Sequence, residues 1–310
     1  MDLGLRHVDS WTRHPVAAVL LIILLAAYFA GRSRLATQDR PARYTVAVFG
    51  LGFVCLWVAF VSPLAELKFS YLYARTVQQA LVGIMAPPLL LHGRMLAMLW
   101  NLVPSDRQHN LNLWWQGTSP WSTVLHWVTG AGPVWLLTVS VFALWHDSAT
   151  VNWLMERPRW ANAALMPYWA TYMMFWWHAM AAMPHLHRPL PVWLRFLYLI
   201  VGGEVANMIT GVTLAFRQEA TYNYYLTANS LEQLTAVQDQ MISGGIIWVT
   251  GSFIYIGVAV ALLGQVLVQR RFEPQLPPRD WQTATLLTIA PGLEDRVSDQ
   301  PVPKPAQRTG

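Results

Sequence analysis

The amino-acid sequence predicts an all-α membrane protein that crosses the bilayer with seven helices, its N-terminus outside and its C-terminus inside. Of its 310 residues, 55% are hydrophobic and only 12% are charged, about half the charge of a typical soluble domain. Apolar stretches recur along the chain, and many of its 17 tryptophans lie at their ends, as expected for aromatic belts at the membrane interfaces.

The seven apolar segments each approach the roughly 20 residues that a helix needs to cross a hydrocarbon core about 30 Å thick. They lie at residues 15–30, 44–61, 73–91, 124–145, 162–183, 192–216 and 242–268. The third segment contains Pro87 and Pro88. In the fourth, Gly130, Gly132 and Pro133 predict a kink.

Arginines are distributed unevenly between the two sets of loops that seven spans create. Loops 31–43, 92–123 and 184–191 and the C-terminal tail carry more of them than the opposite set, so the positive-inside rule places this side in the cytoplasm. The net charge of +5 then reflects topology and contact with lipid headgroups, and we expect no nucleic-acid partner. Arg6 and Arg13 before the first segment also suit a signal peptide, but no small-x-small cleavage site follows them cleanly.

The composition changes after the seventh segment, which ends at Arg270 and Arg271. We predict a transmembrane domain at 1–271 and a polar, partly disordered cytoplasmic tail at 272–310. Prolines interrupt any helix at the start of this tail. Residues 281–290 suit a short amphipathic helix, and the residues from Ser298 onward are typical of disorder.

Polar groups fall at the outer ends of four predicted helices, where burial makes them costly and therefore informative. They are Arg75, Gln78 and Gln79 in the third segment, Trp145, His146 and Asp147 at the end of the fourth, Arg217 after the sixth, and Asp239, Gln240 and Met241 around the start of the seventh. We expect these groups to converge on one face of the protein.

His146 is the best candidate of this group for binding a metal or moving a proton, since imidazole is a common copper and zinc ligand and titrates near neutral pH. Asp239 supplies oxygen and Met241 a soft thioether for Cu(I), so these three form the predicted metal site. Asp147 and Asp239 are also placed to pair with Arg75 or Arg217, or to orient His146. The alternative is a polar cap that satisfies helix ends and anchors loops, and this face contains no two-histidine or Cys-His spacing.

Other polar residues lie away from this face. Glu204 and Asn207 share one face of the sixth segment, where a buried acid is either functional or hydrogen-bonded to a neighbouring helix. His178, His185 and His187 gather toward the cytoplasmic end of the fifth segment, and we expect them to be structural. The histidines at 92, 109 and 126 are too scattered along the sequence to support an argument.

No motif for hydrolysis or nucleotide binding is present. The single cysteine, Cys55, lies in an apolar run and offers neither a disulfide nor a CxxC motif, so we expect it to be a packing residue. We therefore expect the protein not to be an enzyme and assign no catalytic residue.

Six short motifs follow one another along the chain. They are VSPLAEL at 61–67, TVQQALVGIMAPPLLLHG at 76–93, LWHDSATVNWLMERPRW at 144–160, FWWHAM at 175–180, GVTLAFRQEATYNYY at 211–225 and DQMISGGIIWVTGSFIYI at 239–256. In this order and spacing they resemble the CtaG family of multi-spanning cytochrome c oxidase assembly factors. The resemblance covers about residues 15–270.

The resemblance implies a role in the biogenesis of a haem-copper oxidase of the respiratory chain, at the bacterial inner membrane. It implies copper as the metal concerned and a cytochrome c oxidase subunit or a copper chaperone as partner. The chain departs from the family where that family has His-Met-x-Gln-His, because Arg75 and Gln79 replace both histidines. The family's histidines near the start of the fifth helix are also absent. Of its outer polar residues only His146 and Asp239 remain, and the cationic Arg75 repels a metal ion at that place.

Two other functions remain open from the sequence. A transporter or channel would use Glu204, Asn207 and the helices broken by proline and glycine. A membrane-embedded enzyme acting on haem or lipid would use His146, Asp147 and Asp239 as its acid-base set. The assembly factor is the leading hypothesis, with the polar outer face touching the client oxidase or a copper donor.

Overall fold

A computed structural model describes residues 14–116, 119–228 and 234–271 of the chain. Within these ranges every regular element is a helix and there is no strand. Contacts divide the chain into a large unit, Met1–Val266, and a second unit, Leu267–Gly310. The following description concerns the first unit. The tail predicted for 272–310 lies outside the described residues.

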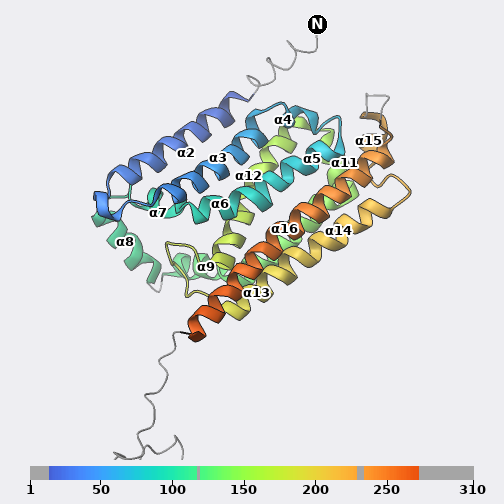
Figure 1. Ribbon diagram of the computed structural model, residues 1–310. Coiled ribbons are helices and arrows are strands. Elements are labelled where there is room, and N and C mark those ends of the chain that lie inside the picture. Colours follow the sequence, from blue (N-terminus) through green and yellow to red (C-terminus); the bar gives the residue numbers. More distant parts are fainter. Residues whose placement is uncertain (1–13, 117–118, 229–233, 272–310) are drawn as a thin grey trace, which may run out of the picture. The chain divides into compact units, whose positions relative to one another are not determined.

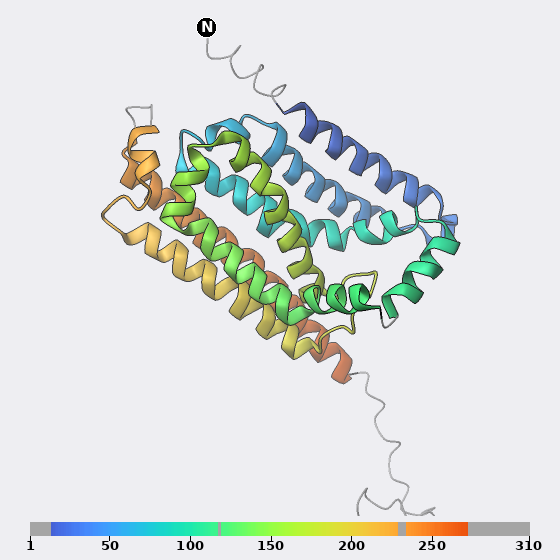
Figure 2. The same cartoon turned by 180° about the vertical axis from the view of Figure 1, so that it is seen from behind.

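The first half of the chain forms a layer of helices around α3 (Figures 1 and 2). Helix α3 packs against α2 and α6, and α2 packs against α7. Of these pairs, α2 and α3 are joined by a short connection, whereas α3 with α6 and α2 with α7 are brought together from further apart in the sequence. The elements are α2 (Pro15–Ser33), η1 (Thr37–Asp39), α3 (Arg43–Val61), α4 (Leu64–Leu67), α5 (Leu72–Gln79), the π-helical turn η2 (Ala80–Met85), α6 (Ala86–His92), α7 (Met95–Trp100) and α8 (Ser105–Gln116).

The second half completes the bundle. Helix α12 packs against both α6 and α10, and α10 packs in turn against α14. Figure 1 shows α16 running alongside α14. The elements are α9 (Pro120–Val128), α10 (Ala131–His146), α11 (Ser148–Met155), α12 (Pro158–Met180), α13 (Val192–Leu199), the π-helical turn η3 (Ile200–Glu204), α14 (Val205–Phe216), α15 (Asn223–Ala228) and α16 (Ala236–Arg271).

Two tryptophans satisfy backbone carbonyls beside the two π-helical turns. Pro87 has no N–H, so the carbonyl of Gly83 lacks the donor that an α-helix would supply. The indole of Trp176 donates to that carbonyl over 3.0 Å. At η3 the indole of Trp135 donates to the carbonyl of Tyr198 over 3.2 Å. Side chains from neighbouring helices thereby make both irregular turns compatible with burial.

Glycines let α14 and α16 approach closely. A Cβ on Gly244 would come within 2.4 Å of the backbone N of Ala215, and one on Gly211 within 2.7 Å of the backbone N of Trp248. Small residues at such crossings allow backbones to pack directly, as is common between membrane helices. By contrast, a Cβ on Gly245 meets nothing within 4 Å.

All seven predicted segments coincide with helices or runs of helices. The predicted kink in the fourth is a 55° bend between α9 and α10. Four helices in the described ranges are long and apolar enough to cross a membrane, or five if this bent pair is one span; they lie at Pro15–Ser33, Arg43–Val61, Val192–Phe216, Ala236–Gln265 and, as the pair, Pro120–His146. The protein is thus an all-α protein with several helices suited to a membrane.

The count of seven spans and the N-out orientation stay predictions. The run from α5 to α6 and helix α12 are the two predicted spans outside this set. Both carry polar side chains in the turns near one end: Arg75 and Gln79 in α5, Arg159 and Asn162 in α12. Such residues lower the mean hydropathy of a helix that is nevertheless packed inside the bundle.

Candidate functional site

The polar residues predicted to converge do meet at one end of the bundle, where α3, α10 and α14 end and α5 and α16 begin. We call it the polar end and define it by seven residues. They are Arg75, Gln78, Gln79, Trp145, His146, Asp239 and Gln240, and all except His146 are buried. Hydrogen bonds between these helices hold it together.

Residues of α5 satisfy the ends of two other helices. Gln78 donates from Nε2 to the carbonyl of Ala59, in the last turn of α3, over 2.7 Å. Arg75 donates from a terminal nitrogen to the carbonyl of Trp145, in the last turn of α10, over 2.6 Å, and its guanidinium lies 5.7 Å from the Trp145 ring centroid. The last carbonyls of a helix have no partner within it, so these contacts join α5 to both neighbours.

Two residues of α16 have similar roles. Asp239 is fully buried, and its two carboxylate oxygens accept from the backbone N–H groups of Leu72 and Tyr73 at 2.7 and 2.8 Å. It therefore caps the N-terminus of α5, where a carboxylate is favoured. Gln240 accepts from the N–H of Thr221 over 2.7 Å and donates to the carbonyl of Leu214 over 3.3 Å, which fastens the end of α14.

The geometry around His146 fixes its tautomer. Its Nδ1 lies 2.8 Å from the carbonyl oxygen of Phe142, and since a carbonyl only accepts, Nδ1 carries the proton. The other ring nitrogen, Nε2, lies 3.0 Å from Nε2 of Gln79. In the neutral imidazole this nitrogen is the acceptor, so the Gln79 amide donates to it. The lone pair with which His146 would bind a metal is engaged by Gln79.

The three residues of the predicted metal site do not come together. His146 contacts Gln79 at one end of α5, whereas Asp239 contacts Leu72 at the other, about 10 Å away along the helix. Met241 is 40% exposed, and its position two residues beyond the buried Asp239 places it on the opposite face of α16. Among the described residues no group of three or more His, Cys, Asp or Glu side chains is placed to hold a metal.

Asp147 and Arg217 lie at the margin of the polar end. Asp147 caps α11, accepting from the backbone N–H and the hydroxyl of Thr150 at 2.8 and 2.9 Å. These two bonds hold the pKa of the Asp147 carboxyl below its usual value. Arg217 lies 4.0 Å from Glu219, and Arg75 donates to the Trp145 carbonyl. The predicted pairing of the two aspartates with Arg75 or Arg217 is therefore not among the contacts of these described residues.

Lys68 is a buried cation that sequence reasoning missed. It is 1% exposed, and its ammonium group donates to the side-chain oxygen of Asn162 over 2.5 Å. Burial lowers the pKa of Lys68 to about 7, a shift that Glu66 opposes and Arg75 reinforces. The available signal was composition, because Lys68 is one of only two lysines in the chain.

A cavity of about 660 Å³ opens beside His146 between α10 and α14. Apolar side chains such as Leu144 and Ile209 line most of it, while His146, Arg217 and Tyr222 line its polar part. The Tyr222 hydroxyl donates to the His146 carbonyl over 3.1 Å. Its volume is typical of sites that take a ligand or a side-chain cluster.

Glu204 and Asn207 both bind α16. The hydroxyl of Ser252 donates to one carboxylate oxygen of Glu204 over 2.5 Å, and the Asn207 amide donates to the carbonyl of Ile247 over 2.8 Å. These contacts match the interhelical hydrogen bonding that the sequence left open as one alternative. They give the transporter hypothesis no added support.

Three histidines meet at the end opposite the polar end. The rings of His126 and His187 are 4.3 Å apart between centroids, and those of His178 and His187 are 5.5 Å apart. His178 donates to the Thr129 carbonyl over 2.8 Å, and His187 Nε2 lies 2.9 Å from the Thr129 hydroxyl. Burial, with a smaller contribution from the other two rings, lowers the pKa of His187 to about 4. The sequence did not connect His126 to this cluster.

Comparison with known proteins gives one result. A family model described as cytochrome c oxidase caa3 assembly factor (Caa3_CtaG) matches residues 26–269, which includes every residue of the polar end. Searches of the curated proteins and of the solved structures found no match.

Proposed function

The chain belongs to the Caa3_CtaG family of cytochrome c oxidase assembly factors, and from this premise we propose that it supports the copper-centre step of oxidase assembly. We place this role in the bacterial inner membrane. The protein acts there as a scaffold rather than as an enzyme, with an oxidase subunit or a copper chaperone as its partner. Copper is cargo in this proposal, carried by the partner or the client.

The cavity beside His146 is the observation that carries the proposal. It lies between two apolar helices and combines an apolar wall with a polar part that holds both Arg217 and Asp147. Leu144 and Ile209 in its wall are 57% and 58% exposed. A helix of a client membrane protein with a polar end fits this combination, because its apolar side chains replace lipid along the groove and its polar end can bind Arg217 or Asp147.

The chemistry of the polar end favours a scaffold over a metal carrier. The His146 lone pair accepts from Gln79, and both oxygens of Asp239 accept from α5. Each metal bond there would therefore cost a hydrogen bond that joins two helices. Surfaces fixed in this way suit docking, which gains from preorganisation.

The test is a deletion strain complemented with variants, in which oxidase activity per unit of oxidase protein and the copper-to-haem ratio of the purified oxidase are measured. We expect deletion to lower activity and copper while haem stays normal. Ala206→Trp, which fills the cavity wall, should fail to restore either quantity. Ala163→Trp, at an exposed alanine of α12 outside the cavity, is the matched control and should restore both. A fully active, copper-replete oxidase in the deletion strain would refute the proposal.

A further inference from the structure

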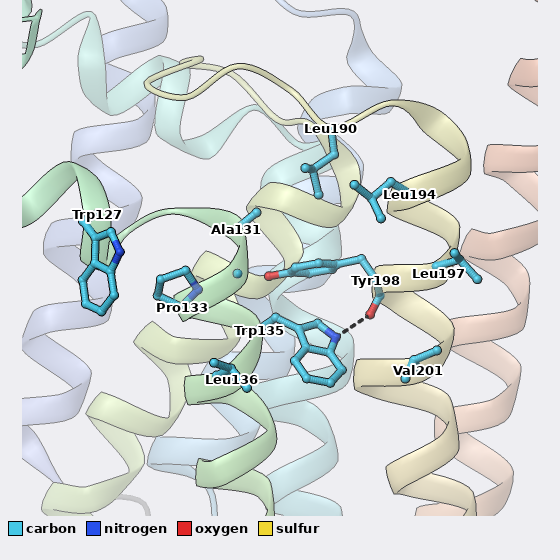
Figure 3. A pocket seen from close by; sticks show the side chains of 11 residues that line it. Trp127, Ala131, Pro133, Trp135, Leu136, Leu190, Leu194, Leu197, Tyr198 and Val201 are labelled. Atoms are coloured by element: carbon cyan, nitrogen blue, oxygen red, sulfur yellow. Dashed lines mark hydrogen bonds between the residues drawn. The ribbon is translucent and has the colours of Figure 1, made fainter.

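A second cavity of about 810 Å³ lies between the start of α10 and α13, away from the polar end. Figure 3 shows its lining, with Trp127, Pro133 and Leu136 on one side and Leu194, Leu197 and Val201 on the other. The wall is almost entirely hydrocarbon and aromatic. Such a wall suits an apolar chain of the bilayer.

Two polar features meet inside this cavity. The hydroxyl of Tyr198 has no hydrogen-bond partner although the residue is only 7% exposed, and Figure 3 shows it pointing toward the first turn of α10 at Ala131. That turn begins after Gly130, which has no side chain to cap it. The first N–H groups of a helix have no partner within it and favour anions.

The charge of the surrounding segments also favours an anionic ligand. No Asp or Glu occurs at 127–136 or at 190–201, the two stretches that line the cavity, and the second stretch contains Arg195. Arg195, in α13 beside the cavity-lining Leu194, is 8% exposed and its Nε has no partner. The loop that brings Leu190 to the cavity also carries Arg188. The cavity therefore combines an apolar slot with unpaired donors, and the segments beside it carry the positive charge of Arg188 and Arg195.

We propose that this cavity binds one anionic phospholipid of the membrane. An acyl chain lies against Leu136, Leu197 and Val201. The phosphate or ester oxygens accept hydrogen bonds from the Tyr198 hydroxyl and from the backbone N–H groups of Ala131 and Gly132, which open α10. Zwitterionic lipids bind less well because the arginines of the surrounding segments favour a net negative headgroup. This site is separate from the proposed docking cavity beside His146.

Native mass spectrometry of the full chain in non-ionic detergent tests the proposal, with phosphatidylglycerol and phosphatidylcholine added in turn to delipidated protein. We expect one molecule of phosphatidylglycerol to be retained at least tenfold more tightly than phosphatidylcholine. Gly132→Leu should abolish this preference, since a Cβ there meets nothing within 4 Å and the side chain can enter the cavity. Gly50→Leu, at a helical glycine with equally open space in no described cavity, should retain it.

Tyr198→Phe separates lipid binding from folding. It should weaken phosphatidylglycerol about tenfold by removing one hydrogen bond to a charged group. The thermal midpoint of the delipidated protein should not fall, because the hydroxyl has no partner within the protein. The proposal would be overturned if both lipids were retained equally, or if Tyr198→Phe and Gly132→Leu left the lipid affinity unchanged. It would also be overturned if Gly132→Leu changed the oligomeric state without loss of lipid.

Discussion

At the scale of single residues, Gln79 decides the chemistry of His146. An imidazole with one free nitrogen lone pair is a ligand or a base, but here the amide of Gln79 donates to that nitrogen. The opposite ring nitrogen is held by Phe142. His146 thus acts in this structure as a neutral link between α10 and α5.

Removing the Gln79 amide should expose the lone pair on Nε2 of His146. In Gln79→Leu we expect His146 to react with diethyl pyrocarbonate several-fold faster than in the wild type, because the cavity beside α10 gives access to the ring. Mass spectrometry of the modified peptide measures the rate. The double variant with His146→Ala identifies the reacting site, and an unchanged rate in Gln79→Leu would show that the amide does not occupy Nε2.

Lys68 should make stability depend on pH. Its pKa is about 7 in the folded protein and near 10.4 in an unfolded chain, so between these values the unfolded chain binds more protons. Stability then rises with pH across this window by about 1.4 kcal/mol per pH unit from this group alone. Below about pH 7 Lys68 is protonated in both the folded and the unfolded state. The free energy of unfolding then carries the full cost of burying the ammonium charge and no longer changes with pH through this group.

Comparison with Lys68→Met isolates this contribution. The thermal midpoint of Lys68→Met minus that of the wild type should be largest at pH 6.5 and should shrink steadily toward pH 10. Tryptophan fluorescence in detergent follows the transition. Arg107→Met removes an exposed cation and should show no such trend. A constant difference for Lys68→Met would mean that Lys68 keeps its charge throughout.

At the scale of helices, the bundle is joined by side chains that complete the ends of other helices. Asp239 of α16 caps α5, Gln240 of α16 binds the end of α14, and Arg75 of α5 binds the end of α10. Trp176 of α12 likewise binds the carbonyl of Gly83, which Pro87 leaves without a donor in its own helix. Such contacts fix helix position along the bundle axis, which apolar packing alone specifies weakly.

Adjacent glycines in α16 give a matched test of helix packing. Gly244→Ala should lower the thermal midpoint by several degrees, because its Cβ meets the backbone of α14 at 2.4 Å and overpacking costs about 1–3 kcal/mol. Gly245→Ala should leave the midpoint unchanged or raise it, since it meets open space and alanine favours helix by about 1 kcal/mol. If both variants behave alike, the close contact between α14 and α16 is absent.

At the scale of the whole molecule, the predicted seven-span topology assigns each loop to one side of the membrane. After Cys55→Ala, single cysteines at Glu156 and Arg188 flank α12, and those at Ser70 and Arg94 flank the run from α5 to α6. With seven spans and an outer N-terminus, an impermeant maleimide should label Glu156→Cys and Ser70→Cys in intact spheroplasts. Arg188→Cys and Arg94→Cys should be labelled only after lysis. Labelling of both members of a pair in intact spheroplasts would mean that this helix does not cross.

Periodicity and hydropathy predicted the places of the helices, and the ordered motifs predicted the family, which the family match confirms. They also predicted that the polar groups gather at one end. They did not predict the contacts between particular residues. Asp239 binds the backbone of Leu72, 167 residues away in the sequence, and Gln79 binds His146, 67 residues away. Asp239 and His146 look like candidate ligands in the sequence, because the partner that satisfies each of them is set only by tertiary packing.

The cap that Asp239 places on α5 has a consequence for how the protein is made. α5 is synthesised early, but the carboxylate that completes its first turn arrives only with α16, 167 residues after Leu72, so the N–H groups of Leu72 and Tyr73 lack this partner until then. A nascent or truncated chain without α16 exposes an unfinished helix end that a complete chain conceals. A chain truncated before α16 should therefore be degraded by membrane proteases faster than the complete chain.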